Sequence, residues 1–489
     1  MLFNSAVFLF AFLPATLAAY YVLGRYAGFR AACGALIAAS LFFYGWWSPK
    51  FLVLLVAATL ANAALGFALA QAGFSDGYRR FLLWAGITGN LALLGYFKYA
   101  GFLAANLNAA LGTALNVGAI VLPLGISFFT FQKIAFLVDA YRGEVRRFDL
   151  AGFFLFVMFF PQLVAGPIVH HREMLPQFAR PEVSRFNALN LAIGLTVFAI
   201  GLFKKMVIAD GCGAIADPVF NGFASGGYFG PAAAWVGALA YAFQLYFDFS
   251  GYSDMAVGLA RMFNIDLPMN FNSPYKAASV IDFWRRWHIT LSRFLRDYLY
   301  IPLGGSRRGP ARRYANLMAT MLLGGLWHGA SWSFVLWGAL HGALLLANHA
   351  WRSLGIRTGR IAATALTFLA VVSAWVPFRM PELAPALRML ATMYDPLRLI
   401  PDAQSYFASQ RFEVAWLLLV AIAVFALPNV YQLFRQQALA ATPDGERRPL
   451  EPASWSWSAS ASWALAASVL MGVALLQLGK ISPFLYFQF

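Results

Sequence analysis

Hydrophobic residues occur in long runs along nearly the whole chain, separated by short segments that carry most of the charges. Many of these runs approach the ~20 residues that an α-helix needs to cross the hydrocarbon core of a bilayer. The pattern predicts an all-α polytopic membrane protein with roughly eleven spans, together with re-entrant and amphipathic helices. The apolar segments lie at residues 3–24, 31–47, 51–73, 82–97, 116–138, 150–169, 188–208, 230–250, 314–346, 361–378, 412–429 and 459–479.

The composition supports this interpretation and excludes a soluble enzyme with a single anchor. Of the 489 residues, 61% are hydrophobic and only 11% are charged, whereas soluble domains carry about 25% charged residues. The net charge of +16 comes from basic residues in the short connecting segments. That placement is typical of the positive-inside rule and gives no reason to expect a nucleic-acid partner. Because Arg25 and Arg30 follow the first run and Arg79 and Arg80 the third, we expect an extracytoplasmic N-terminus.

Charges and prolines interrupt the apolar pattern between about residues 170 and 315, so a functional site should be sought there. Segment 282–313 reads DFWRRWHITLSRFLRDYLYIPLGGSRRGPARR. Its spacing predicts an amphipathic helix at the cytoplasmic interface, with Arg286 and Arg293 on its polar side. The residues on its apolar face are Trp284, Trp287, His288, Leu291 and Leu295.

The residues alone leave the roles of His288 and of the arginines in this segment open. A histidine on an apolar face, such as His288, is commonly a hydrogen-bonded structural residue. The eight arginines from Arg285 to Arg313 suit either the lipid surface or the binding of an anionic donor, such as a coenzyme A phosphate or an acidic carrier protein.

A second candidate lies in the apolar run 321–342, which contains His328 and His341. An ionisable residue inside a membrane span is costly and is by default a functional candidate. Glycines at 324, 325 and 329 permit close backbone approach around His328. A histidine can take a proton from a hydroxyl at neutral pH, so we assign His328 to general-base chemistry and His341 to packing. No spacing typical of metal ligands accompanies them, and we expect no bound metal.

The sequence resembles the membrane-bound O-acyltransferase family, in particular its bacterial alginate O-acetylation and teichoic acid D-alanyl transfer branch. The matching stretches run in order through most of residues 1–345. They are FNSAVFLFAFLP near the N-terminus, LGYFKYAGF, LPLGISFFTFQKIAFLVDAYRG, FPQLVAGPI, QLYFDFSGYSDMAVGLARMF, FNSPY, FWRRWHITLSRFLRDYLYIPLGG and GGLWHGASW. The two characteristic histidines of the family fall on His288 and His328, with His328 at the position usually assigned as catalytic.

The resemblance implies a ring of helices around a thinned centre with a tunnel. It implies transfer of an acyl group from a cytoplasmic thioester to an extracytoplasmic polysaccharide such as alginate, and we expect that group to be acetyl. The donor would be acetyl-CoA or an acyl-carrier thioester, with no bound cofactor. His288 would line the cytoplasmic approach to His328. The candidate donor-binding residues are Arg285, Arg286, Trp287, Arg293 and Arg296.

The chain ends in a segment with its own pattern. Beyond an acyltransferase core at 1–430, we expect a cytoplasmic polar linker at 431–458, then a final span and an extracytoplasmic aromatic tail within 459–489. The ending PFLYFQF resembles the C-terminal motif of the small partner protein of the D-alanyl system. By that resemblance Tyr486 would carry the acyl group, since a phenol assisted by a base is a competent nucleophile. The alternative is an aromatic belt at the lipid headgroups.

Location and partners follow from the same resemblance. We expect a multi-pass protein of the bacterial inner membrane with both termini extracytoplasmic. Its expected partners are a serine-hydrolase-like acetyltransferase outside the cytoplasm, the polysaccharide synthesis and export machinery, membrane lipid and an acyl carrier protein. The competing hypotheses are D-alanyl transfer from a carrier protein and a non-catalytic polysaccharide flippase or scaffold.

Overall fold

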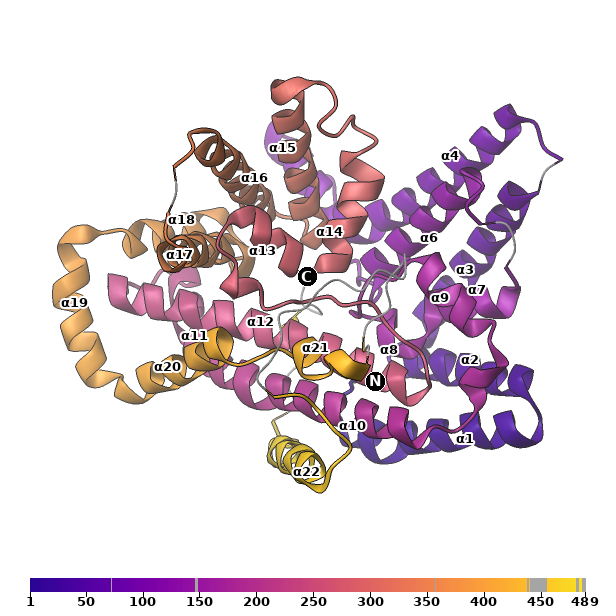
Figure 1. Cartoon of the computed structure of the whole chain (residues 1–489). Helices are drawn as coiled ribbons and strands as arrows, with labels where there is room; N and C mark the ends of the chain where they lie inside the picture. Colours follow the sequence, from indigo (N-terminus) through magenta and orange to yellow (C-terminus); the bar gives the residue numbers. More distant parts are fainter. Residues whose placement is uncertain are drawn as a thin grey trace. The chain divides into compact units, whose positions relative to one another are not determined.

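The computed structural model describes residues 1–71, 73–145, 148–356, 358–437, 439, 455–480 and 483–485 (Figure 1). These residues form helices and connecting loops and no β-strand, which confirms the all-α prediction. They divide into two compact units. Unit 1 comprises 1–202, 252–269 and 430–483, and unit 2 comprises 203–251, 270–429 and 484–489.

Unit 1 contains the N-terminal helices and the last long helix of the chain. Its elements are η1 Phe8–Phe12, α1 Leu13–Tyr26, α2 Phe29–Gly45, α3 Pro49–Ala70, α4 Asp76–Leu94, η2 Gly95–Tyr99, α5 Ala100–Leu111, α6 Ile126–Tyr141, α7 Leu150–Met158, α8 Phe160–Leu163, α9 His171–Phe178, η3 Pro181–Ser184, nearly all of α10 Ala188–Phe203, the end of α12 Pro231–Met262, α21 Val430–Leu433, η7 Arg435–Gln437 and α22 Ala461–Leu475.

Unit 2 contains the candidate histidines of the sequence analysis. Its elements are η4 Lys204–Ala209, α11 Asp210–Ala224, most of α12, η5 Pro274–Lys276, α13 Val280–Arg286, α14 Ile289–Leu295, η6 Arg296–Tyr300, α15 Gly309–His328, α16 Trp332–Ser353, α17 Arg360–Arg379, α18 Leu383–Met393, α19 Pro396–Ser409 and α20 Arg411–Ala426. Its buried core is rich in aromatic side chains, including Trp287, Trp337 and Trp375.

Among the described residues, four helical stretches are long and apolar enough to cross a membrane. They are Phe8–Tyr26, Pro49–Ala70, Ala188–Ala224 and Arg360–Arg379. The pair α19 and α20, bent by 98°, would count as a fifth if it forms one broken span. Roughly eleven spans therefore remains a prediction. The linker expected at 431–458 lies largely outside the described residues, and the domain boundaries around it also remain predictions.

The apolar segment 314–346 is divided into two helices, α15 and α16, which pack against each other. The break falls at Gly329, which is extended with φ −163° and follows His328, the last residue of α15. Close approach of the two helices depends on glycine, since a Cβ on Gly325 would lie 2.3 Å from the carbonyl oxygen of Phe334. A Cβ on Gly338 would lie 2.4 Å from the carbonyl oxygen of Met321. Small residues are the usual means of such contact in membrane helices.

Candidate active site

His288 lies at a break between α13 and α14, with φ +41° in the left-handed region. The continuous amphipathic helix predicted over 282–313 is therefore wrong in its continuity. Pairing with the preceding loop maintains the break, because the Ile289 N–H donates to the Asn270 carbonyl at 2.9 Å. The Asn272 N–H likewise donates to the Arg286 carbonyl at 2.9 Å. A left-handed backbone conformation is energetically costly for a non-glycine residue, and such conformations commonly occur at functional sites.

The side chain of Asn270 fixes the tautomer of His288. Asn270 Oδ1 lies 2.9 Å from His288 Nδ1 and also accepts from the Thr290 hydroxyl at 2.9 Å. An amide oxygen can only accept, so Nδ1 of His288 carries the proton and Nε2 presents a lone pair. Burial lowers the pKa of His288 to about 3, which keeps the ring neutral near pH 7. His288 therefore combines the hydrogen-bonded structural role with the electronic state of a base.

His328 is the last residue of α15 and is 5% exposed. Its ring contacts three aromatic side chains at nearly equal distance. The ring centroids lie 4.9 Å from Trp327, 5.0 Å from Trp337 and 5.1 Å from Phe378. A histidine surrounded in this way is shielded from water, and the neighbouring rings restrict its orientation.

Two tryptophans connect three of the four histidines of unit 2, namely His288, His328 and His341, into one cluster. Trp327 contacts both His288, at 6.3 Å between ring centroids, and His328. Trp337 contacts both His328 and His341, the latter at 4.8 Å. The structure therefore places His288 and His328, the two residues picked out by the resemblance, one tryptophan apart.

His341 is the most deeply packed of these three histidines together with His288. It is fully buried, with its ring 5.1 Å from Trp284, 5.8 Å from Trp375 and 6.1 Å from Phe283. Neither ring nitrogen has a hydrogen-bond partner among the described residues. This environment agrees with the packing role that we expected for His341.

The predicted donor-binding residues separate into surface and core positions. Arg285 and Arg296 are exposed, and Arg296 pairs with Asp297 at 2.6 Å. Arg286 pairs with Asp282, with Nε 3.0 Å from each carboxylate oxygen, and Arg293 is half-buried. Trp287 is only 4% exposed and its ring lies 4.9 Å from Trp375. Trp287 therefore packs in the core of unit 2, and the donor-binding role of all five residues remains a prediction.

The described part of the C-terminal tail is buried in unit 2, with Phe484 1% and Leu485 5% exposed. The Leu485 N–H donates to Asp248 Oδ2 at 3.0 Å. Asp248, on α12, also pairs with Lys205 at 2.7 Å, and the Lys205 ammonium lies 5.2 Å from the centre of the Phe484 ring. Tyr486 lies outside the described residues.

Lys205 is presented by η4, a π-helical turn within the long helical stretch Ala188–Ala224. Such turns occur frequently at functional sites. The Lys205 side chain is 2% exposed and pairs with Asp210 at 2.9 Å as well as with Asp248. The buried Lys205 pairs with two carboxylates, and one of them accepts the Leu485 N–H. We call Lys205, Asp210 and Asp248 the tail anchor.

A separate polar cluster in unit 1 consists of Asp139, His170 and His171, whose potential ligand atoms lie within 4.8 Å of one another. His170 Nε2 lies 2.8 Å and His171 Nδ1 3.3 Å from Asp139 Oδ2. His170 Nδ1 accepts the Arg172 N–H at the start of α9, so Nε2 carries the ring proton and donates to Asp139. This hydrogen bonding describes a clamp between the ends of α6 and α9, and we call the three residues the clamp.

Comparison with known proteins identifies the family. The sequence profile of the membrane-bound O-acyltransferase family matches residues 78–376. This chain belongs to that family. It is therefore a membrane acyltransferase, and the predicted enzyme class is confirmed.

Several relatives extend the similarity beyond the matched region. A peptidoglycan O-acetyltransferase of Helicobacter pylori is 45% identical over 425 residues, covering 80% of each chain. A protein of Azotobacter vinelandii named "Probable alginate O-acetylase" is 40% identical over 516 residues, covering 100% of each chain. A teichoic acid D-alanyltransferase of Streptococcus thermophilus is 30% identical over 239 residues, covering 47% of this chain and 57% of that protein.

Sequence reasoning missed the residues that support the histidines. Asn270 precedes the FNSPY motif by one position, and its contact with His288 spans 18 positions of sequence. Lys205 and Asp248 showed one detectable signal, since charged residues within apolar runs are costly unless they are paired. Trp327 and Trp337 could have been noticed because each lies within a turn or a few turns of a candidate histidine.

Proposed function

We propose that this membrane acyltransferase moves an acetyl group from a cytoplasmic thioester donor across the inner membrane, for O-acetylation of an extracytoplasmic polysaccharide such as alginate. The principal support is the similarity over the full length of both chains to the relative named for alginate O-acetylation. The peptidoglycan relative, at 45% identity, supports O-acetyl transfer to a cell-envelope polymer more generally.

In this proposal His328 is the general base. The attacking hydroxyl gives its proton to the imidazole, its oxygen forms the new C–O bond, and the carbon–sulfur bond of the thioester breaks. The proton then passes to the leaving thiolate, so that a free thiol and an oxygen ester result. A positioned base of this kind contributes about 10²–10⁴-fold to rate. The three rings around His328 support this role, because they restrict the orientation of the imidazole.

His288 is the second proposed catalytic residue, on the donor side of His328. Its Nδ1–H is held by Asn270, so Nε2 can accept a hydrogen bond from the donor or from a bridging water. Arg285, Arg286, Arg293 and Arg296 are proposed to attract the phosphates of acetyl-CoA or the acidic surface of a carrier protein. Arginine suits phosphate because its planar guanidinium offers several donors.

Tyr486 is the proposed acyl carrier in a two-step relay. The phenol first takes the acetyl group from the thioester, with His328 accepting the proton. The aryl ester then passes the acetyl group to a hydroxyl, either on the extracytoplasmic acetyltransferase or on the polymer, and the phenol is regenerated. The tail anchor supports this step, because it holds the adjacent Leu485 in the unit that also contains His288 and His328.

The test is the acetyl content of the surface polysaccharide in strains that carry single variants at equal membrane levels. We expect His328→Ala and Tyr486→Phe each to abolish acetylation. His349→Ala and Tyr26→Phe are matched controls, since His349 lies near the end of α16 and Tyr26 is 79% exposed in unit 1. Full acetylation in Tyr486→Phe would reject the relay while leaving the enzyme intact. Full acetylation in His328→Ala would reject the catalytic assignment and favour the scaffold or flippase hypothesis.

D-alanyl transfer from a carrier protein is the second candidate function, favoured by the Streptococcus thermophilus relative. Its match covers about half of this chain, whereas the acetylation relatives cover 80% to 100%. Mass spectrometry of the modified polymer separates the two, because an acetyl and a D-alanyl ester differ in mass and only the latter adds an amine.

A further inference from the structure

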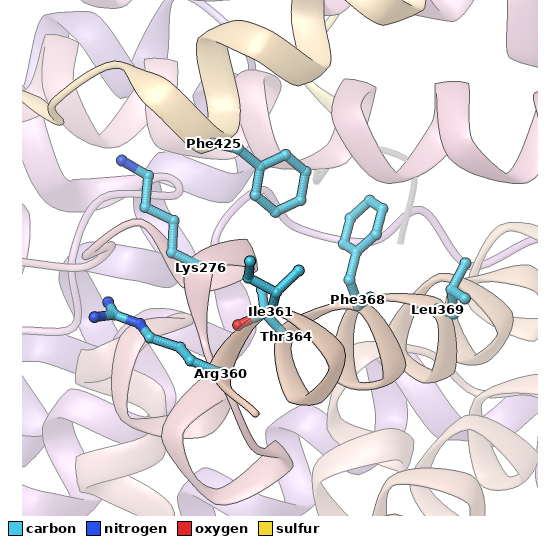
Figure 2. Close-up of a pocket in the computed structure, with 8 residues that line it drawn as sticks. Lys276, Arg360, Ile361, Thr364, Phe368, Leu369 and Phe425 are labelled. Carbon is cyan, nitrogen blue, oxygen red and sulfur yellow. The ribbon is translucent and has the colours of Figure 1, made fainter. Parts of the chain in front are cut away.

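A groove of about 540 Å³ lies on unit 2 beside α17, away from the residues assigned to catalysis. Figure 2 shows its cationic groups on one side and its hydrophobic side chains extending to the other. None of the eight lining residues is acidic. These residues are Lys276, Arg360, Ile361, Thr364, Ala365, Phe368, Leu369 and Phe425.

The cations occupy one end of the groove. Arg360 is the first residue of α17, and the Lys276 ammonium is held in place by a hydrogen bond to the Leu427 carbonyl at 2.8 Å. Leu369 lies nine residues further along α17, which at 1.5 Å per residue is about 13 Å from Arg360 along the helix axis. One leaflet of the hydrocarbon core is about 15 Å thick, half of the total. The cationic end of the groove therefore suits a lipid headgroup, and the length of its apolar part is close to the thickness of one leaflet of acyl chains.

The apolar wall is strongly exposed. Ile361 is 88% exposed, Leu369 42% and Phe425 39%, and α17 is one of the stretches apolar enough to cross a membrane. Phe368 and Phe425, which both line the groove, meet edge to face with ring centroids 5.3 Å apart. Exposed apolar surface next to two cations is complementary to an amphiphile that carries an anionic head.

We propose that this groove binds an anionic phospholipid, with its phosphodiester at Lys276 and Arg360 and one acyl chain along Phe368 and Leu369. Basic pockets between membrane helices are established binding sites for anionic headgroups. A zwitterionic lipid would bring a second positive charge to the same two cations and is disfavoured by repulsion. This lipid is a bound partner of the enzyme and is distinct from the acyl donor.

The site has a structural connection to the catalytic histidine. Phe378, on the last turn of α17, contacts His328 at 5.1 Å between ring centroids. Lipid bound at the first turns of α17 would restrain the helix that supplies one wall of the His328 environment. We therefore expect bound anionic lipid to raise activity modestly, about two- to fivefold, by stabilising that helix.

The experiment uses the full-length protein, delipidated in detergent and titrated with phosphatidylglycerol or with phosphatidylcholine of the same acyl chains. Bound lipid is counted by native mass spectrometry. We expect at least a fivefold preference for phosphatidylglycerol, lost in a Lys276→Gln/Arg360→Gln double variant and retained in Arg352→Gln. Arg352 is the matched control because it is an exposed arginine near the end of α16, outside the groove.

Three outcomes would overturn the proposal. Equal retention of both lipids would show a nonselective annular contact. Retention of phosphatidylglycerol by the double variant would place the lipid elsewhere. Full displacement of the lipid by inorganic phosphate would indicate a phosphate site in which the acyl chain contributes nothing. An Ile361→Ser variant provides a second measurement, since Ile361 is highly exposed and its replacement should weaken lipid binding without unfolding the protein.

Discussion

Two groups of histidines in this protein have contrasting surroundings. In the clamp of unit 1, His170 and His171 face the buried carboxylate of Asp139 at 2.8 and 3.3 Å. In unit 2, His328 and His341 are surrounded by aromatic rings. The clamp histidines pair with a charge, and aromatic rings pack around His328 and His341.

These surroundings suit the two groups of histidines to different roles. In the clamp, the carboxylate of Asp139 joins the end of α6 to the start of α9 through His170 and His171. An aromatic environment holds an imidazole in one orientation by ring packing, and a positioned imidazole can act as a general base. We therefore assign the clamp to stability and the aromatic cluster to chemistry.

The largest expected effect comes from disturbing the helix that carries His328. In Gly325→Ala the new Cβ would lie 2.3 Å from the Phe334 carbonyl oxygen, so α15 and α16 must separate at a cost of about 3 kcal/mol. Gly324→Ala is the matched control, because its Cβ would meet only the flexible Leu295 Cδ1 at 3.3 Å. Thermal unfolding in detergent measures both. Equal loss of stability in the two variants would contradict the close packing at Gly325.

Removal of the clamp carboxylate should affect stability and leave the chemistry intact. Asp139→Ala deprives His170 and His171 of their shared partner in a buried site, at a cost of about 2–3 kcal/mol. We expect a lower unfolding temperature with an unchanged rate of acyl transfer per folded molecule. A rate lowered by 100-fold at full stability would place the clamp in the catalytic machinery and erase the contrast between the two groups.

In contrast to Asp139→Ala, the variant Asn270→Ala should lower the rate of acyl transfer. Loss of the Oδ1 acceptor frees His288 to adopt either tautomer, so Nε2 no longer reliably presents a lone pair. We expect acyl transfer to fall about 10- to 100-fold. Asn270→Asp retains an acceptor oxygen and should recover part of the rate. If both variants transfer at the wild-type rate, His288 has no tautomer-dependent role.

The smallest effect is a dependence of stability on pH through the clamp. Burial lowers the pKa of His171, against the opposing effect of Asp139. The unfolded chain, with a histidine pKa near ~6.5, then binds a proton more readily than the folded state. Stability should decrease as the pH falls through about 6.5, by at most ~1.4 kcal/mol per pH unit. His171→Gln should make the unfolding temperature less dependent on pH between pH 5 and 7. An unchanged pH dependence in this variant would show that His171 is not its source.

The sequence was sufficient for the broad architecture and for the two main candidates. Apolar runs indicated a helical membrane protein, and the motifs around His288 and His328 indicated the family, because these signals are local in sequence. The left-handed break at His288 was not visible, since it depends on pairing with the Asn270 loop 18 positions earlier. The apolar run 314–346 concealed a break between two helices, because its only marker is the short sequence Gly329–Ala330–Ser331.

The tail anchor shows the same limit over a longer distance. The hydrogen bond between Asp248 and Leu485 joins residues 237 positions apart, and no local pattern predicts such a contact. The clamp was overlooked because two consecutive histidines after a loop carry no periodic signal, and their partner Asp139 lies on another helix. Long-range polar pairing therefore accounts for most of what the sequence left undetermined.

We propose above that His328, within the aromatic cluster, is the general base of acyl transfer. The most direct measurement is acyl transfer by purified His328→Gln and His171→Gln proteins with a radiolabelled thioester donor, at matched thermal stability. We expect a loss of at least about 100-fold in His328→Gln and a nearly unchanged rate in His171→Gln. A His328→Gln rate within about threefold of wild type, a difference of less than ~0.7 kcal/mol in the barrier, would contradict it.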